Sequence, residues 1–152
     1  MPYNASFQCF RGCQNRFPLT EIIYKCPDCG GLLQVRHDMS ELQKRSGQEW
    51  QQLFDGRYMT TEWPYGSSVW GKKEMVCPEV EDENVVSMYE GGSNLFWAER
   101  LGREIGIDDL WVKQCGSTHS GSFKDLGMTV LVSQVQEIRR NGGTLSAVGC
   151  AS

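Results

Sequence analysis

The sequence has 152 residues and a formal net charge of −4, so its length suits one ordinary domain or two small ones. With 19 acidic against 15 basic residues there is no broad basic field, which argues against nucleic acid or an anionic membrane as a partner. No apolar stretch approaches the roughly 20 residues that span a bilayer, so no membrane segment is expected.

The N-terminus and the cysteine usage both bear on the compartment. Residues 1–7 lack a basic region followed by an apolar run, so no signal peptide is expected. Seven cysteines make an odd count, and four of them are spaced like metal ligands rather than like a disulfide framework. These features predict a reducing, cytoplasmic compartment.

Composition divides the chain into three expected parts. Residues 1–38 carry the paired cysteines, residues 39–90 form a mixed connector, and residues 91–152 have α/β character. No internal repeat or low-complexity tract is visible. The sequence therefore predicts three units with these bounds.

The first two parts contain short predicted elements. Ile22–Lys25 and Leu32–Val35 have the composition of short β-strands. In the connector, Ser40 is a candidate cap for a helix that begins at Glu41, and a second helix is predicted over Glu49–Phe54.

The first part contains two short-spaced cysteine pairs. Three residues separate the first pair, and twelve residues later the chain continues as Cys26-Pro-Asp-Cys29-Gly-Gly. Four sulfurs in such pairs suit a tetrahedral site, so we predict structural zinc in a zinc-ribbon-like unit. The expected ligands are Cys9, Cys13, Cys26 and Cys29. The first pair is one residue wider than usual, and three alternatives stay open: a metal-free knuckle, a rubredoxin-type iron site, and unmetallated thiols.

The third part begins with a predicted amphipathic helix. Ser93 is a good N-cap, and Gly106 would end the helix. Its apolar face is expected to comprise Leu95, Ala98, Leu101 and Ile105.

A strand, a helix and a second strand are predicted next. The strands are Leu110–Gln114 and Thr144–Cys150, and Ser122 would cap a helix over Phe123–Arg140 that stops at Gly142. The apolar side of this helix is expected to hold Leu126, Val130, Leu131, Val135 and Ile138. This order predicts a right-handed parallel βαβ unit, which has too few strands to cover its own faces.

Lys124 follows a turn rich in glycine and serine and opens the last predicted helix. A lysine that forms an imine must first lose its proton, and burial at the positive end of a helix lowers its pKa. The turn offers hydroxyls and close backbone amides for anionic oxygens. On these grounds alone, Lys124 is a candidate for such chemistry, and a solvated helix residue is the alternative.

The segment around Lys124, Gly121-Ser-Phe-Lys-Asp-Leu-Gly-Met128, resembles the cofactor-lysine motif of pyridoxal-phosphate enzymes with the tryptophan-synthase β-like fold. Within that family it is most similar to threonine synthases of the plant and cyanobacterial type. Glu90-Gly-Gly-Ser-Asn-Leu95 resembles the family's Glu-Gly-Asn-Ser/Thr-x-Leu loop. Further similarity to the plant type extends the resemblance over about residues 17–152.

The resemblance implies a fold class and a reaction. The fold would be α/β, with a small zinc-ribbon-like unit followed by an incomplete βαβ portion of a fold-type II enzyme. The reaction would convert O-phosphohomoserine and water to threonine and phosphate, with pyridoxal 5'-phosphate as cofactor.

The resemblance also assigns roles to particular residues. Lys124 corresponds to the lysine that holds the cofactor as a Schiff base, and Phe123 lies beside it in the cofactor site. Lys113 is placed like a lysine that binds the substrate's phosphate, and Ser117 and Thr118 lie in the loop near the substrate. His119, which stands where common relatives have proline, is expected to be structural or exposed.

The resemblance implies an incomplete enzyme, because the loop after Ser152, the glycine-rich cup for the cofactor phosphate and the group facing the pyridine nitrogen are missing. The 152-residue chain is therefore expected to be inactive alone, and the full-length form is expected to be a homo-oligomer. Two alternatives stay open. One is another fold-type II enzyme, such as a cysteate synthase or a dehydratase, and the other is a stand-alone zinc-ribbon binding module.

Overall fold

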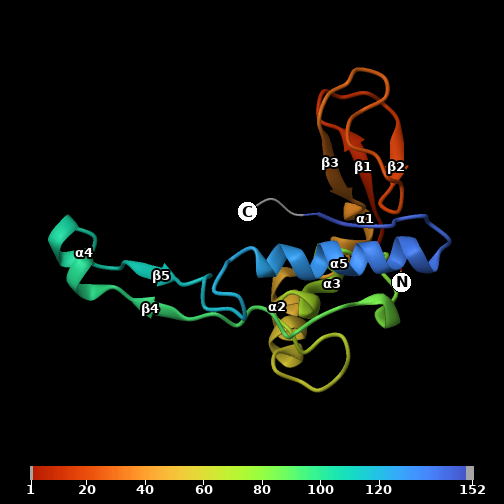
Figure 1. The fold of residues 1–152 in the computed structure, drawn as a ribbon. Helices are drawn as coiled ribbons and strands as arrows, with labels where there is room; N and C mark the ends of the chain where they lie inside the picture. The colour runs from red at the N-terminus through yellow and green to blue at the C-terminus, as the bar shows by residue number, and fades with distance from the viewer. Residues whose placement is uncertain (1, 150–152) are drawn as a thin grey trace.

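The computed structural model describes residues 2–149, which form a mixed α and β structure with two small sheets (Figure 1). Within this range no helix combines the length and the apolar character needed to cross a membrane. The elements in chain order are β1 (Ala5–Cys9), β2 (Arg16–Pro18), β3 (Leu33–His37), α1 (Met39–Leu42), α2 (Gly47–Arg57), η1 (Trp70–Lys72), α3 (Lys73–Val76), η2 (Asp82–Asn84), β4 (Leu95–Trp97), α4 (Glu99–Ile105), β5 (Trp111–Lys113) and α5 (Asp125–Arg140).

The first sheet has the order β2-β1-β3 and is antiparallel throughout. Because side chains alternate across a strand, Ala5, Phe7 and Cys9 share one face of β1, and Ala5 and Phe7 reach the core. The strand predicted at Leu32–Val35 is confirmed as β3. The strand predicted at Ile22–Lys25 is wrong, because the chain turns there to bring Cys26 toward Cys9.

The helices of the connector are fixed by local caps. Asp38, rather than the predicted Ser40, caps α1, and its Oδ1 accepts from the backbone N–H of Ser40 at 2.9 Å. The predicted second helix is confirmed as α2, which begins earlier because Ser46 and Glu49 form a capping box.

The hydrophobic core lies where the first sheet, the connector and α5 meet. Trp70 lies within this core and is 0% exposed. The other buried members are Ala5, Leu19, Cys77, Val80 and Val85, with Phe7, Val69, Val76 and Val130 packed against them. All three predicted parts therefore contribute to one core, and their division into separate units stays a prediction.

Helix α5 contacts this core through a polar stripe. Its buried residues are Thr129, Ser133 and Glu137, which are four residues apart and share one side of the helix. The predicted apolar side is only half-buried at Val130, and Leu131 is exposed. The prediction is wrong in this respect, because the neighbouring chain is irregular and needs hydrogen-bond partners more than apolar cover.

The irregular segment beside α5, residues 77–90, forms hydrogen bonds with the side chains of this polar stripe. The backbone N–H of Val86 donates to Ser133 Oγ at 2.8 Å, and Thr129 Oγ1 donates to Val86 O at 2.7 Å. Trp70 Nε1 donates to Thr129 Oγ1 at 2.9 Å, which ties the stripe to the core. One element thus satisfies both the core tryptophan and the backbone that surrounds it.

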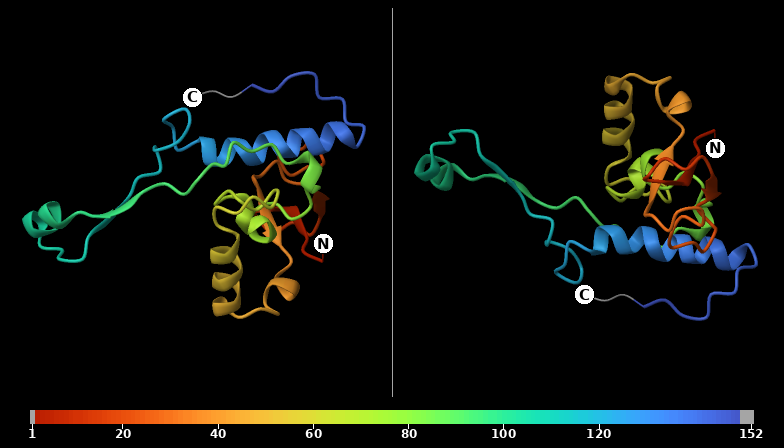
Figure 2. Two further views of the ribbon diagram at one scale, coloured as in Figure 1. Left: turned by 90° about the horizontal axis from the view of Figure 1, so that it is seen from below. Right: turned by 90° about the horizontal axis from the view of Figure 1, so that it is seen from above.

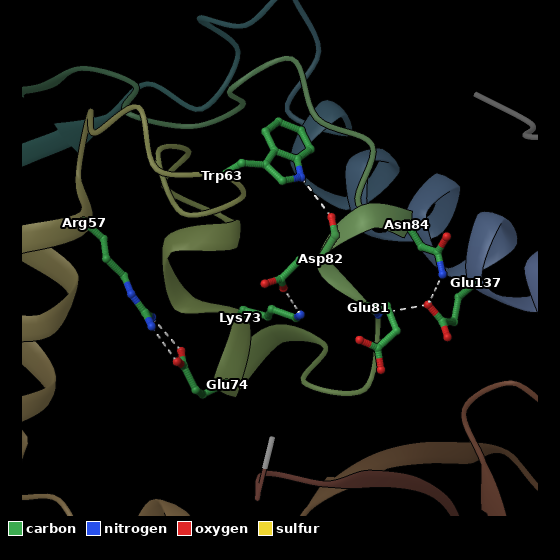
Figure 3. A network of polar contacts seen from close by, with 8 residues as sticks. All are labelled: Arg57, Trp63, Lys73, Glu74, Glu81, Asp82, Asn84 and Glu137. Carbon is green, nitrogen blue, oxygen red and sulfur yellow. Dashed lines mark hydrogen bonds and ion pairs between the residues drawn. The ribbon is translucent and has the colours of Figure 1, made fainter.

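Figure 3 shows the polar network around this junction. Glu137 Oε2 accepts from the backbone N–H of Glu81 at 2.9 Å and from Asn84 Nδ2 at 2.7 Å. On the other side, two nitrogens of the Arg57 guanidinium each lie 2.8 Å from an oxygen of the buried Glu74 carboxylate. This bidentate pairing compensates a charge whose isolated burial is costly.

The elements β4, α4 and β5 form an arm that projects away from the rest of the molecule in all views (Figures 1 and 2). The helix predicted to start at Ser93 begins instead at Glu99, because Leu95–Trp97 is the strand β4. Gly106 ends the helix as predicted, with a left-handed φ of 75°. The predicted strand Leu110–Gln114 is confirmed as β5.

The predicted parallel βαβ unit is not formed in residues 2–149. β5 pairs with β4, and the pairing is antiparallel. Thr144–Gly149 has no regular secondary structure, and Cys150 lies outside the described residues. A parallel strand needs a covered, extended sheet around it, and the two-stranded arm offers none.

Trp70 provides a test of this core. Replacing Trp70 by Ala removes the largest fully buried side chain and the partner of Thr129 Oγ1, so we expect a loss of about 3–5 kcal/mol in the free energy of unfolding. Denaturant unfolding followed by circular dichroism measures this loss. The control Tyr24→Ala removes a side chain that is 84% exposed and should stay within about 0.5 kcal/mol of the wild type. Equal stability of the two variants would contradict the described core.

Candidate functional site

The four paired cysteines meet in one cluster. One ligand atom from each of Cys9, Cys13, Cys26 and Cys29 lies within 4.8 Å of the others. Cys9 Sγ and Cys29 Sγ are 3.5 Å apart, close to the roughly 3.8 Å edge of a tetrahedron with metal–sulfur bonds of about 2.3 Å. The cluster could therefore hold a metal ion, as the spacing predicts.

The backbone around the cluster is shaped to direct the sulfurs inward. The N–H of Gly12 donates to Cys9 O at 3.1 Å, and the N–H of Gly30 donates to Cys26 O at 2.8 Å. Both glycines have positive φ, 91° and 66°, which a side chain would strain. Cys9 Sγ also accepts from the backbone N–H of Arg11 at 3.3 Å.

The sulfurs of the cluster differ in how readily they lose a proton. The backbone N–H of Cys13 is the main cause that lowers the pKa of Cys9 to about 6, and the sulfur of Cys29 is the main cause that raises the pKa of Cys13 to about 12. Thiolate is the form that binds metals, so Cys9 is prepared for a cation. Binding at all four sulfurs would release protons.

Lys124 stands at the N-terminus of α5, where it occupies the N-cap position. Its backbone N–H donates to Ser122 Oγ at 3.3 Å, so the predicted capping serine contacts this turn. The side chains of Lys124 and of Phe123 are exposed. Its amine is accessible to a ligand in this chain.

Asp125 holds the turn that precedes Lys124. Its carboxylate accepts from Thr118 Oγ1 at 2.6 Å, from the backbone N–H of Ser120 at 2.9 Å and from Ser120 Oγ. The hydrogen bond from Ser120 Oγ is the main cause that lowers the pKa of Asp125 to about 2. The single hydroxyl proton of Thr118 is shared between Asp125 and Ser122 O, which lies 2.9 Å from Thr118 Oγ1, so the turn is closed at both ends.

The same turn is attached to the irregular chain beside α5. His119 Nε2 donates to the backbone oxygen of Met88 at 2.6 Å, which agrees with the structural role expected for it. The buried carboxylate of Glu90 accepts from the N–H of Met88 at 2.9 Å and from Ser87 Oγ at 2.7 Å. A groove of about 260 Å³ lies here, with Met88, His119 and Asp125 among its lining residues.

The loop that follows Glu90 packs closely on the connector. A Cβ at Gly91 would lie 1.6 Å from Ser68 Oγ, and the φ of Gly91 is 98°, so no side chain fits there. The backbone N–H of Gly92 donates to the same Ser68 Oγ at 2.9 Å. This glycine pair therefore sets how the arm leaves the core.

The remaining predicted site residues lie on the same stretch of chain. Lys113 ends β5, and its Nζ donates to the backbone oxygen of Ser93 at the base of the arm. Ser117 and Thr118 lie in the turn that Asp125 holds. The structure thus brings Thr118, Phe123 and Lys124 onto one loop, and the roles of all these residues stay predictions.

Sequence reasoning missed Asp125 as the organiser of the loop. The usable signal was a carboxylate that follows hydroxyl residues five and seven positions earlier, Ser120 and Thr118.

Curated proteins are similar in sequence to almost the whole of this chain. Threonine synthase 2, chloroplastic, of Arabidopsis thaliana is 53% identical over 137 residues, which are 90% of this chain and 26% of that protein. Threonine synthases of Methanocaldococcus jannaschii and Methanosarcina acetivorans are 35% and 36% identical over 140 residues, 92% of this chain and 30% and 29% of theirs. The chain spans less than a third of the length of these relatives. No protein-family model matches it.

Asp125→Asn tests the turn. The change removes the charge that strengthens three hydrogen bonds, so we expect faster hydrogen–deuterium exchange of the amides in residues 117–124. Because folding lowers the pKa of Asp125 from 3.8 to about 2, its stabilising effect is complete above about pH 4 and is lost as pH falls toward 2. The stability difference between wild type and variant should therefore shrink over that interval.

The matched control is Asp55→Asn on the exposed side of α2, which should leave the exchange of this turn unchanged. Unchanged exchange in the Asp125 variant would show that the turn is held by other contacts.

Proposed function

We propose that this chain, which is homologous to threonine synthases over nine tenths of its length, supplies the lysine-bearing part of such an enzyme. The observation that carries the proposal is the 53% identity to the Arabidopsis relative over 137 residues. The proposed reaction converts O-phosphohomoserine and water to threonine and phosphate. A fold-type II architecture, a homo-oligomer and a cytoplasmic location belong to the same proposal for the complete protein.

The residues around Lys124 suit pyridoxal 5'-phosphate. An exposed primary amine can bond to the aldehyde of the cofactor, and the turn before it carries hydroxyls beside a helix N-terminus, where anionic oxygens are stabilised. When bound, this cofactor would supply an electron sink for the substrate's carbanion. Lys124 would hold it and move protons at Nζ, while Asp125 keeps the turn in place.

The substrate would be bound by residues on the same loop and strand. Lys113 offers a cation for the phosphate, and Ser117 and Thr118 offer hydroxyls beside it. Thr118 Oγ1 already donates to Asp125, so Thr118 would bind substrate as an acceptor or through its backbone.

We further propose that the cysteine cluster binds structural zinc. Four thiolates within one tetrahedral cluster are typical of closed zinc sites, and the strands around it are too short to form a large core. Gln134 Nε2 of α5 donates to the backbone oxygen of Leu19 at 2.8 Å, and Leu19 belongs to the shared core. These contacts favour a ribbon built into an enzyme over a stand-alone binding module.

Zinc content tests the metal proposal. We expect about one zinc per chain by elemental mass spectrometry, and Cys26→Ser should lower that ratio strongly and destabilise the first sheet. Cys115→Ser, which lies outside the cluster, is the control and should retain the metal. Iron in place of zinc, or a metal content that Cys26→Ser leaves unchanged, would refute the proposal.

Activity tests the enzyme proposal in a chimera in which this chain replaces its matching part of the Arabidopsis relative. We expect threonine and phosphate from O-phosphohomoserine, and Lys124→Ala should lower the rate by about three orders of magnitude or more. Borohydride reduction followed by mass spectrometry should find the cofactor on Lys124. Lys44→Ala removes an exposed lysine of the connector and should leave the rate unchanged.

The 152-residue chain alone should form no detectable threonine, because it spans only 26% of the length of the Arabidopsis relative. A chimera that forms no threonine, or one that keeps its rate without Lys124, would overturn the enzyme proposal.

A further inference from the structure

The C-terminal end of α5 places an asparagine directly before a glycine. The helix ends in a Schellman motif, in which the N–H of Gly142 donates to Arg139 O at 3.2 Å. In the same motif the N–H of Gly143 donates to Ile138 O at 2.8 Å. Gly142 has a left-handed φ of 85°, which a residue with a side chain adopts only with strain. This way of ending the helix therefore requires a glycine after Asn141.

An asparagine in this position can lose its side-chain amide without an enzyme. Asparagine is one of the chemically labile residues, because the backbone nitrogen of the next residue can attack its side-chain carbonyl carbon. A side chain on that next residue obstructs the attack, and Gly142 has none. Asn141 and Gly142 are both exposed, and a Cβ added at Gly142 would meet nothing within 4 Å, so solvent base and water reach the site.

The amide of Asn141 also belongs to the network that attaches α5 to η2. Its Nδ2 donates to Glu137 Oε1 at 2.8 Å. The other oxygen of that carboxylate accepts from the backbone N–H of Glu81 and from Asn84 Nδ2, as Figure 3 shows. Glu137 is 5% exposed, so these donors offset the cost of burying its charge. The labile amide is thus one of the donors to a buried carboxylate.

The other four asparagines of the sequence precede residues that carry a side chain. Asn4, Asn15, Asn84 and Asn94 are followed by alanine, arginine, valine and leucine. Asn15 is the closest comparison, because it is exposed and its Nδ2 donates to a carboxylate oxygen of Asp28 at 2.9 Å. It therefore shares the exposure and the carboxylate partner of Asn141 and lacks the glycine.

We propose that Asn141 is a deamidation site, and that its conversion to aspartate or isoaspartate weakens the attachment of α5 to η2. The product carries a carboxylate where the amide donated a hydrogen bond. Glu137 then loses a donor and gains a like charge beside it, which is costly for a buried group. The proposal is independent of the proposed reaction, because it rests only on contacts at the end of α5.

The reaction consumes one water and releases one ammonia, with no change of oxidation state. The backbone nitrogen of Gly142 gives its proton to solvent base and bonds to Cγ of Asn141. The Cγ–Nδ2 bond breaks, and Nδ2 takes up protons from solvent and leaves as ammonia. Water then opens the cyclic imide at either carbonyl and gives aspartate or isoaspartate. Because the N–H of Gly142 is bonded to Arg139 O, the attack requires fraying of the last helical turn, which helix ends undergo.

Peptide mapping by mass spectrometry tests the site in the unaltered 152-residue chain, kept for days at mildly alkaline pH. We expect Asn141 to lose its amide about tenfold faster than Asn15, because only Asn141 precedes glycine. Each conversion raises the mass by the difference between an amide and a carboxyl group, and chromatography separates the aspartyl from the isoaspartyl peptides. Equal rates at the two asparagines would overturn the proposal.

Asn141→Asp tests the effect of the new charge. We expect a Tm lower than that of the wild type by about 4 °C or more, because the buried carboxylate loses a donor and meets a like charge. Asn141→Ser removes the donor without adding a charge, so its Tm should lie between the two. The N–H of Glu81, which donates to the same carboxylate, should exchange faster with deuterium in the Asp variant.

The matched control is Asn15→Asp, which places a like charge beside the exposed Asp28 and should shift the Tm by less than about 2 °C. Equal Tm shifts at the two positions, or an unchanged exchange rate at Glu81 in Asn141→Asp, would show that the modification does not act on the attachment of α5. Either result would overturn the proposal.

Discussion

Hydrogen bonds from one side of α5 to the irregular chain beside it hold the rest of this structure in place. Residues 77–90 contain little regular secondary structure, so their backbone groups need partners from elsewhere. Thr129, Ser133 and Glu137 supply them at four-residue spacing. Such bonds are directional, whereas apolar contacts allow a helix to slide or rotate. The docking of α5 therefore also fixes Lys124, which stands at its first turn, and the segment around Leu19, whose backbone oxygen accepts from Gln134.

The sequence predicted those elements whose signals are local. The helical runs of α2 and α5 lie within single segments, so both helices were predicted, but the Ser46–Glu49 capping box that begins α2 was missed. Leu95–Trp97 was predicted as helix, because Leu95 fits the apolar spacing of the helix that follows. Its strand state depends on pairing with Trp111–Lys113, a partner that no local pattern reveals. The buried stripe of α5 escaped prediction because hydroxyl and carboxylate side chains resemble a solvated face.

In the candidate site, too, features with local signals were predicted and features that depend on distant contacts were not. The spacing of the cysteine pairs predicts a cluster that could hold a metal ion because each pair forms a local turn, and only the meeting of the two pairs is non-local. The position of Lys124 at a helix start was also local information. The exposure of its side chain could not be predicted, because burial depends on neighbouring elements rather than on a motif. The hydrogen bond from Thr118 to Asp125 was missed, because the turn between these two residues has no periodic sequence pattern.

The open hairpin also has a consequence for the solubility of this chain. Unpaired strand edges and exposed tryptophans promote aggregation, and chaperones recognise the same features. Two properties of the arm limit this hazard. Each strand has only three residues, which is too short to template an extended fibre, and Lys113 places a charge at one end. The arm can thus carry exposed tryptophans on open strands while offering little edge for another chain to pair with.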